Sequence, residues 1–525
     1  MLNESRIFQT YKEIFSDNGK LMYAGMLLKR AYELFHDNVA LEASDRTVTY
    51  RELFYRTLCL GETLKRHGVK PRDKVALLYE NSPEFFVAYF AIWQCGAVVV
   101  PLNTFLHPKE LAYIINDAAP SVLIVSPTHK KSCDALSAEA VATMPMILSN
   151  EIFDWQTPVP ECIDDVARHF EICELDLDEL CALLYTSGTT GTPKGVMLSS
   201  RNVMTNALQD YTRFTLLGMA THERFFCVLP LFHVFAQNTC LWLPMMVGAT
   251  VIIVTRIERS LILDGLRKKP TLFFGMPALY GLLCLMKKAP LDSVKMFISG
   301  ADMLPAKISS LFSIVYGRKI SPGYGLSEAA PVVAVNHENY NSSTIVVGLP
   351  VVGLSCEIRD DAGTVCEPDT IGTLWLKGDN VMLGYYQAPH LTQQVLVDGW
   401  LNTGDLASID TSGRLAIHGR TKDVIIHKGF NIYPAEVENV LLMHPSVFRA
   451  AVIGNSDPLT GQIPVAFVAA KVRDEKLEKD LRALCVRNLA AYKIPRTFVC
   501  CDDLPVNATG KVDKKQLRAT LDKGI

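Results

Sequence analysis

The chain of 525 residues is too long for one compact core, so two or three domains are expected. A content of 49% hydrophobic and 20% charged residues fits an ordinary globular protein. The formal net charge of −3 supplies no general positive field, which excludes a protein drawn to nucleic acid by its charge. From Lys422 onward basic side chains outnumber acidic ones, whereas the rest of the chain is acidic. An anionic ligand held between the two regions would suit this asymmetry.

The cysteines and the first residues indicate the compartment. Fourteen cysteines are scattered along the chain, and none forms a Cys-x-x-Cys pair. The opening residues, MLNESRIFQTYKEIF, lack the apolar segment of a signal peptide. Together these features favour a cytoplasmic protein with free thiols over a disulfide framework or a zinc site.

Two long uncharged segments, residues 85–102 and 225–255, have the length of membrane spans. Gly96 and Pro101 interrupt the first segment, which predicts a buried helix followed by a short β-run. The second segment contains helix breakers and polar residues: Pro230, His233, Gln237, Asn238, Pro244 and Gly248. Lipid-facing helices rarely contain so many of these, so we expect buried segments of an α/β protein.

Short apolar runs alternate with helix-like segments up to about residue 345. Continuous apolar runs without polar alternation predict parallel strands that are covered on both faces. We expect such strands at residues 75–80, 122–126, 181–187, 250–254, 272–275 and 296–299, and helices at 106–117 and 200–211. This alternation is typical of a layered α/β fold.

The pattern changes in the last third of the chain. Shorter, turn-rich strands such as 373–378 and 413–419 predict a β-subdomain. Near residue 422 a new unit begins, with strand-like and helix-like segments in the order strand, helix, strand, strand, and then a charged helix at 475–490. The sequence therefore predicts a large layered N-terminal domain over residues 1–421 and a small, mobile α+β domain over residues 422–525.

Glycines, hydroxyl side chains and Lys194 are concentrated in LLYTSGTTGTPKGVMLSS, residues 183–200. The segment before this run predicts a strand, and LSSRNVMTNALQDYT after it predicts a helix. Backbone N–H groups at a junction of strand and helix bind phosphate, and Lys194 adds a positive charge. No Walker A pattern can be found from Gly188 or Gly191, so a flexible surface loop is the alternative interpretation.

The segment YTSGTTGTPKGV (185–196) resembles the signature of the adenylate-forming superfamily, which includes acyl-CoA synthetases, peptide-synthetase adenylation domains and firefly-type luciferases. Four further segments resemble motifs of that family and occur in the same order: YGLSE (324–328), GWLNTGD (399–405), GRTKDVIIHKGFNIYPAEVE (419–438) and LPVNATGKVDKKQLR (504–518). Five ordered matches make the resemblance specific.

The resemblance implies a two-step reaction. A carboxylate attacks the α-phosphate of ATP to give an acyl-adenylate and pyrophosphate, and a thiol such as CoA then takes the acyl group. The implied phosphate-binding residues are Thr186, Ser187, Gly188, Thr189, Thr190 and Lys194. Glu328 would bind Mg²⁺, a hard cation that prefers oxygen ligands. Tyr324, Gly325 and Ser327 belong to the same motif, and Ser327 keeps the hydroxyl of the family's usual threonine.

Further residues are assigned by the same resemblance. Asp405 would accept hydrogen bonds from the ribose hydroxyls, and Arg420 would donate to the sugar or the phosphate. Lys511 would neutralise the charge that grows between the carboxylate and the α-phosphate, which makes it a catalytic candidate with Thr186 and Glu328. A hinge is implied at Lys422. A loop for the pantetheine arm is implied at 427–431, where Gly429 would let the backbone approach the ligand.

The acyl site is expected beside ISGADML (298–304), which corresponds to the family's SGGAPL strip. Gly300 and Ala301 would border the adenine and the acyl group, although Ala301, Asp302 and Met303 depart from the consensus. His233 is the only histidine of a long apolar stretch, and the family often has an aromatic residue or a histidine at this place. We therefore expect Phe232, His233 and Met303 to contact the substrate; a buried core histidine is the alternative.

These observations predict an ATP-dependent acyl-CoA synthetase that uses Mg²⁺ and CoA and acts on a medium- or long-chain fatty acid. An aryl-CoA ligase of the coumarate type, a ligase that loads an acyl carrier protein and a luciferase-like oxygenase remain open. Glu328 and Gly348 are 20 positions apart, which leaves little room for the insertion that carrier-loading ligases often have. Peripheral membrane association is also left open. A membrane-embedded or structural protein is the alternative of a different class.

Overall fold

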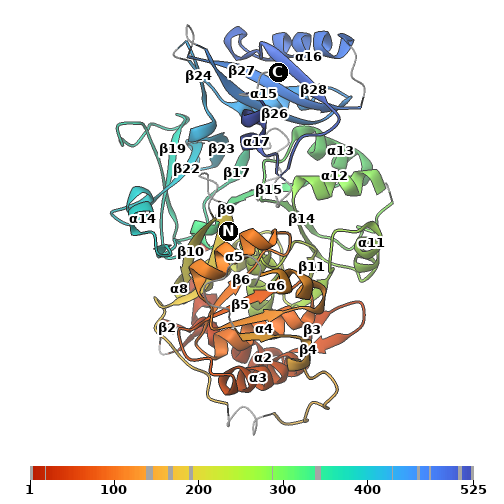
Figure 1. The fold of residues 1–525 in the computed structure, drawn as a ribbon, viewed down its shortest axis with the longest axis vertical. Coiled ribbons are helices and arrows are strands. Elements are labelled where there is room, and N and C mark those ends of the chain that lie inside the picture. The colour runs from red at the N-terminus through yellow and green to blue at the C-terminus, as the bar shows by residue number, and fades with distance from the viewer. Residues whose placement is uncertain are drawn as a thin grey trace.

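The computed structural model of the chain describes residues 4–17, 19–136, 146–163, 170–187, 193–286, 288–336, 345–428, 430–457, 461–471, 475–506 and 511–521. Two large sheets, a β-subdomain and a C-terminal α+β unit follow one another along the chain (Figure 1). The predicted α/β architecture, with a large N-terminal and a smaller C-terminal part, is confirmed.

The first large sheet has seven strands in the order β20-β10-β9-β6-β5-β7-β8. Its parallel strands are β5 (Lys74–Leu78), β6 (Val98–Pro101), β7 (Val122–Val125), β8 (Met146–Leu148) and β9 (Leu180–Ser187). Two antiparallel strands, β10 (Pro193–Ser199) and β20 (Gly384–Tyr385), complete one edge. The three strands expected in this region are therefore present.

The second large sheet has eight strands in the order β16-β15-β14-β13-β11-β12-β3-β4. These are β3 (Val39–Glu42), β4 (Thr47–Thr49), β11 (Arg224–Cys227), β12 (Thr250–Ile253), β13 (Leu272–Gly275), β14 (Met296–Ser299), β15 (Ser321–Gly325) and β16 (Val332–Val335). Antiparallel pairs close both edges, and the strands between them are parallel. The cavity described below lies against β14 and β15.

Helices pack on the sheets and between them. Those of the N-terminal part are α1 (Glu4–Ile14), α2 (Leu27–Phe35), α3 (Tyr50–Arg66), α4 (Pro83–Gln94), α5 (Pro108–Ala118), α6 (Lys130–Leu136), α8 (Ser200–Leu216), α9 (Val234–Gln237), α10 (Leu243–Val247), α11 (Arg259–Arg267), α12 (Pro277–Met286), α13 (Ala306–Tyr316) and α14 (Pro389–Val395). One hydrophobic core contains residues of both large sheets together with α4 and α8. Ser82 and Ser199 cap the N-termini of these two buried helices by accepting backbone N–H bonds.

The two uncharged segments are buried parts of the fold, as predicted. Residues 85–102 form most of α4 and then β6, and residues 225–255 run from β11 through α9 and α10 to β12. Within the ranges given above, no helix combines the length and the apolarity that crossing a bilayer requires. All fourteen cysteines are free, which confirms the expectation of unpaired thiols.

The glycine-rich segment differs from the prediction. Residues 193–199, expected to lead into a helix, form strand β10, which pairs antiparallel with β9 and places Lys194 opposite Thr186. The segment is therefore the turn region of a hairpin, and α8 begins only at Ser200. At Gly195 a Cβ atom would lie 2.9 Å from Leu183 Cδ1, so the close approach of the two strands favours glycine. Residues 188–192 themselves lie outside the described ranges.

The β-subdomain is a six-stranded antiparallel sheet. Its strands are β17 (Val346–Gly348), β18 (Ser355–Arg359), β19 (Gly372–Lys377), β21 (Leu396–Val397), β22 (Trp400–Ile409) and β23 (Leu415–Arg420). It includes both strands expected at 373–378 and 413–419. Across β22 and β23, Asp405 is the direct partner of Arg420.

The C-terminal unit has its own five-stranded sheet, formed by β24 (Ile425–His427), β25 (Phe430–Ile432), β26 (Val447–Asp457), β27 (Gly461–Ala470) and β28 (Thr497–Cys501). Helices α15 (Pro434–Leu442), α16 (Glu475–Asn488) and α17 (Lys514–Leu521) accompany it. Figure 1 shows this unit in blue at one end of the molecule, next to α13 and the β-subdomain. A boundary between residues 421 and 422 remains a prediction.

Candidate active site

The mouth of the β9–β10 hairpin carries two of the predicted phosphate-binding residues. Thr186 and Lys194 are cross-strand partners and are half-buried. Gly188, Thr189 and Thr190 lie outside the described ranges, as does the side chain of Ser187. The two strands thus bring a hydroxyl and an ammonium to the same end of the first sheet.

A tyrosine that the sequence did not single out connects Lys194 with Glu328. The Tyr385 hydroxyl donates a hydrogen bond to Glu328 Oε1 over 2.9 Å, and Lys194 Nζ lies 5.0 Å from the centroid of the Tyr385 ring. Tyr385 reaches this position because β20 pairs with β10. Burial and the Glu328 carboxylate both raise the Tyr385 pKa, so the hydroxyl stays a neutral donor. Glu328 is thereby held beside the β9–β10 hairpin.

A second tyrosine holds the carboxylate of Asp405. The Tyr324 hydroxyl donates to Asp405 Oδ2 over 2.5 Å, and Arg420 Nε lies 3.4 Å from Asp405 Oδ1. Only 7% of Asp405 is exposed. This burial raises the Asp405 pKa, and the Arg420 guanidinium and the Tyr324 hydrogen bond only partly offset it. Asp405 is therefore a desolvated carboxylate kept in place by one neutral and one cationic donor.

Lys511 joins these groups from the C-terminal unit. Burial lowers the pKa of its ammonium, and the positive charge of Arg420 lowers it further. The carboxylates of Asp302 and Asp405 raise this pKa and offset part of the shift. Lys511 also acts on His233, since burial and the Lys511 charge together lower the pKa of that imidazole to about 4. Residues far apart in the sequence thus act on one another. Lys511 comes from the C-terminal unit, and Asp405 and Arg420 come from the β-subdomain. Asp302 follows β14 of the second sheet, and His233 directly precedes α9.

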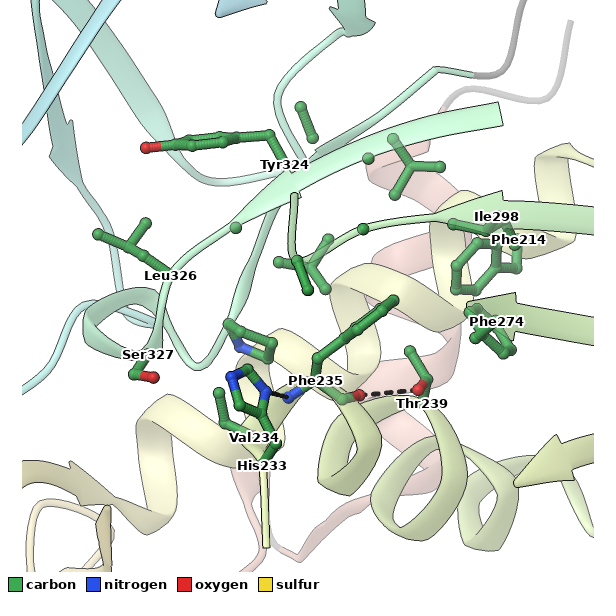
Figure 2. A pocket seen from close by; sticks show the side chains of 18 residues that line it. Phe214, His233, Val234, Phe235, Thr239, Phe274, Ile298, Tyr324, Leu326 and Ser327 are labelled. Atoms are coloured by element: carbon green, nitrogen blue, oxygen red, sulfur yellow. Dashed lines mark hydrogen bonds between the residues drawn. The ribbon is translucent and has the colours of Figure 1, made fainter. Parts of the chain in front are cut away.

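An apolar cavity opens beside this cluster (Figure 2), with an empty volume of about 490 Å³ that includes its open mouth. Phe214, Phe274 and Ile298 gather at one end, and His233 and Ser327 lie at the other. The wall on the second sheet is formed by residues 298–301 and 323–327, including Gly300, Ala301, Tyr324, Gly325 and Ser327. His233 and Ser327 therefore make one end polar, whereas the other end is mainly aromatic and aliphatic and has the Thr239 hydroxyl beside Phe274.

The geometry of α9 orients His233. His233 is the N-cap of this helix, and its Nδ1 accepts a hydrogen bond from the Phe235 N–H over 3.3 Å. The low pKa keeps the ring neutral, so the proton belongs on Nε2 when Nδ1 is the acceptor. The ring can thus donate one hydrogen bond at its Nε2 without adding charge.

Not all predicted site residues line the cavity. Phe232 packs edge-on against Phe105, with ring centroids 5.8 Å apart, and is not part of the cavity wall. Met303 is also outside the wall, and its Sδ accepts from Asn439 Nδ2 of α15 over 3.5 Å. Lys422 is exposed in the turn Thr421–Asp423, and Gly429 lies outside the described ranges. The substrate, hinge and acceptor roles of these residues remain predictions.

The donor set agrees with a cation that is held mainly by phosphate oxygens. Over the ranges that the structure describes, no group of three or more His, Cys, Asp or Glu side chains could hold a metal by itself. Glu328 offers a carboxylate beside the phosphate-binding hairpin. A single carboxylate together with substrate phosphates is the usual environment of Mg²⁺, so the residues present fit this ion.

Comparison with known proteins agrees with these features. The sequence profile of the family "AMP-binding enzyme" matches residues 28–386, and that of "AMP-binding enzyme C-terminal domain" matches residues 436–511. A feruloyl-CoA synthase of Amycolatopsis sp is 34% identical over 484 residues, covering 91% of this chain and 95% of the relative. A long-chain-fatty-acid–CoA ligase of Bacillus subtilis (strain 168) is 30% identical over 519 residues, covering 92% of each.

The solved structure of the anthranilate CoA ligase AuaEII in complex with anthranoyl-AMP is similar to this chain, with a TM-score of 0.86 and 28% identity over 96% of this chain and 98% of that one. The chain therefore belongs to the AMP-binding enzyme family, the adenylate-forming superfamily that its motifs resemble. It falls among the acyl- and aryl-CoA ligases of that family.

The buried carboxylate of Asp405 generates a stability prediction. A carboxyl group whose folded-state pKa is raised stabilises the fold at low pH, and this contribution is lost as the pH rises through the folded-state pKa. At pH 7 the ionised carboxylate is a net cost that an amide avoids. We expect Asp405→Asn to raise the temperature of unfolding at pH 7, and the difference from the wild type to shrink as the pH falls towards about 4, the usual pKa of an aspartate.

Asp410 is the matched control, because hydrogen bonds from Ser412 and Arg414 outweigh its desolvation and lower its pKa to about 2. Asp410→Asn should therefore lower the unfolding temperature at pH 7, with the opposite sign. Thermal unfolding followed by circular dichroism at both pH values measures the two differences. Destabilisation of equal size in both variants at pH 7 would contradict the assignment for Asp405.

Proposed function

We propose that this protein is an ATP-dependent acid–CoA ligase that first forms an acyl-adenylate and then transfers the acyl group to the thiol of CoA. The observation that carries the proposal is the position of Lys511, which belongs to the C-terminal unit and lies in the electrostatic field of Asp302, Asp405 and Arg420 of the N-terminal part. A cation at this place is suited to the negative charge that develops when a carboxylate attacks the α-phosphate.

The other polar residues have roles that follow from their contacts. Asp405, fixed by Tyr324 and Arg420, is suited to accept hydrogen bonds from the ribose hydroxyls. Thr186 and Lys194 are suited to hold the β- and γ-phosphates. Glu328 would hold Mg²⁺, which supplies charge neutralisation on the phosphate oxygens. His233, neutral and with its proton on Nε2, can donate to an oxygen of the substrate carboxylate.

Thioester formation needs a second arrangement of the same residues. Lys511 would contact the carboxylate during adenylation, and the thiol must later reach the same carbonyl, so we infer that the two cannot occupy this approach at once. The lid formed by the C-terminal unit is therefore proposed to rotate between the two steps about Lys422, which lies in the exposed turn Thr421–Asp423. The segment 427–431 would then face the pantetheine arm.

For the substrate we propose a medium- or long-chain fatty acid. The far end of the cavity is formed by Phe214, Phe274 and Ile298, which suits an alkyl chain. Thr239, the one hydroxyl side chain on the α9 side, already donates to the Phe235 carbonyl over 2.7 Å.

An aryl acid is the second candidate. The rings of Phe235 and Phe274 meet edge to face, with centroids 6.3 Å apart, and Gly300 forms part of the opposite wall without a side chain. A Cβ atom at Gly300 would lie 3.0 Å from the Phe235 ring, so this ring packs directly against the glycine. A planar substrate ring would suit this place if the Phe235 ring turned aside.

A panel of acids distinguishes the two candidates. If the alkyl chain occupies the apolar end, each added methylene should contribute about 0.8 kcal/mol, or roughly fourfold in kcat/KM, until the cavity is filled. Acid-dependent pyrophosphate release is measured for straight-chain, benzoic and cinnamic acids, with CoA, with an acyl carrier protein and without an acceptor. A flat response to chain length combined with a clear aryl preference would reverse the order of the two candidates.

Lys511→Ala separates the two half-reactions. We expect adenylate formation to slow by on the order of a hundredfold or more, because the charge in the transition state loses its cation. Thioester formation from supplied acyl-adenylate should stay close to the wild-type rate. Lys515→Ala is the control, since Lys515 is an exposed lysine of the neighbouring helix α17. Equal loss of both half-reactions in Lys511→Ala would refute its role in adenylation.

Tyr385→Phe tests the position of Glu328. The substitution removes the hydroxyl that donates to the Glu328 carboxylate over 2.9 Å. We expect the Mg²⁺ concentration for half-maximal adenylation to rise about tenfold, which corresponds to the free energy of one hydrogen bond to a charged group. The rate at saturating Mg²⁺ should change little. The neighbouring Tyr386→Phe is the matched control. The same Mg²⁺ requirement in both variants would contradict the positioning role of Tyr385.

A further inference from the structure

Lys307, in the first turn of α13, makes a contact between the two parts of the molecule that no motif predicts. Its Nζ donates hydrogen bonds to the carbonyl oxygens of His444 over 2.9 Å and Val447 over 2.8 Å, and the Pro445 carbonyl oxygen lies 3.4 Å away. These carbonyls belong to the turn between α15 and β26 of the C-terminal unit. Figure 1 shows α13 directly beside that unit.

The chemistry of this contact suits a lysine. An ammonium has three N–H donors and no acceptor, and three carbonyl oxygens surround it. The carbonyl groups that follow the end of a helix carry partial negative charge, which a cation stabilises. Burial lowers the Lys307 pKa, and the nearby Lys471 adds to this. A half-buried ammonium therefore depends on these carbonyls more than a solvated one would.

The contact is connected to Lys511 through α15. Glu438 of α15 forms an ion pair with Lys514 over 2.6 Å, and it also accepts from the Val452 N–H over 2.7 Å. Lys514 is three residues after Lys511 and begins α17. The end of α15 that Lys307 binds is thus part of the same packed unit that carries Lys511 into the site.

Two neighbours of Lys307 in the sequence face the same unit. Met303 accepts a hydrogen bond from Asn439 of α15 over 3.5 Å, and the Asp302 carboxylate favours the charged form of Lys511. Residues 302 and 303 are positions at which the chain departs from the strip expected for the family. The segment that follows the cavity wall therefore contacts the lid at Met303 and Lys307. Asp302 in addition acts electrostatically on Lys511.

We propose that Lys307 is a positioning residue for adenylate formation: its hydrogen bonds to the turn after α15 hold the C-terminal unit in the orientation that places Lys511 in the site. The inference rests on the proposed function, because it concerns the step that Lys511 serves. Rotation of the lid for thioester formation would break these hydrogen bonds, so Lys307 stabilises one orientation and not the other.

Lys307→Met tests this role, because it keeps most of the side-chain volume and removes the ammonium. The loss of hydrogen bonds made by a charged donor should slow single-turnover pyrophosphate release by about tenfold to a hundredfold. Thioester formation from supplied acyl-adenylate should be unchanged or faster. Lys307→Arg keeps the charge with a different donor geometry, so its rate of pyrophosphate release should lie between those of the wild type and Lys307→Met. Lys288→Met, at an exposed lysine after α12, is the control.

Hydrogen–deuterium exchange provides a readout that does not depend on activity. In Lys307→Met the amides of residues 443–447 should exchange faster, while those of β27, in the middle of the same unit, should not change. Equal slowing of both half-reactions, or unchanged exchange at 443–447, would overturn the proposal. If the wild-type protein releases no pyrophosphate with any acid, the proposed function fails, whereas the exchange measurement still decides whether Lys307 holds the lid.

Discussion

The Lys511 ammonium lies between the two parts of the molecule, where burial opposes its charge and the carboxylates of Asp302 and Asp405 favour it. Much of the candidate site depends on this balance. A cation that is only partly compensated by protein carboxylates remains available for a substrate with growing negative charge. Because Lys511 belongs to the C-terminal unit, the proposed rotation of that unit would bring the charge into the site or remove it.

Neutral donors organise the carboxylates around this cation. Tyr324 and Tyr385 each donate a hydroxyl to an acid, Asp405 in one case and Glu328 in the other. At Glu328 the tyrosine fixes the position of the carboxylate without cancelling its charge, whereas Asp405 is also paired with the Arg420 guanidinium. The acids therefore keep their capacity to accept further hydrogen bonds or to bind a cation. Desolvated carboxylates reduce stability at neutral pH, and such a cost is typical of functional sites.

The apolar cavity and the charged cluster meet at His233. On one side lie the rings and strand edges that suit the hydrophobic part of an acid, and on the other lie Lys511 and its carboxylate neighbours. Burial and the nearby cation keep the imidazole neutral, so it can face both environments with little desolvation cost. The contacts of Lys307 and Met303 with the lid begin just beyond this cavity wall, which connects the acyl site to the orientation of the C-terminal unit.

The sequence alone predicted the central strands β5, β6, β7, β9, β12, β13 and β14, because parallel strands covered on two faces appear in the sequence as continuous apolar runs. It also determined the family, since five motifs occur in order. Only the tertiary structure decided that residues 193–199 form a strand: PKGVMLS is extended because β9 and β20 pair with it, and β20 lies far along the chain. Only the tertiary structure likewise brings Tyr385 to Glu328, Lys307 to the carbonyl of His444 after α15, and Phe232 to Phe105. These contacts join distant segments, and no local pattern of residues encodes which distant partner a side chain will meet.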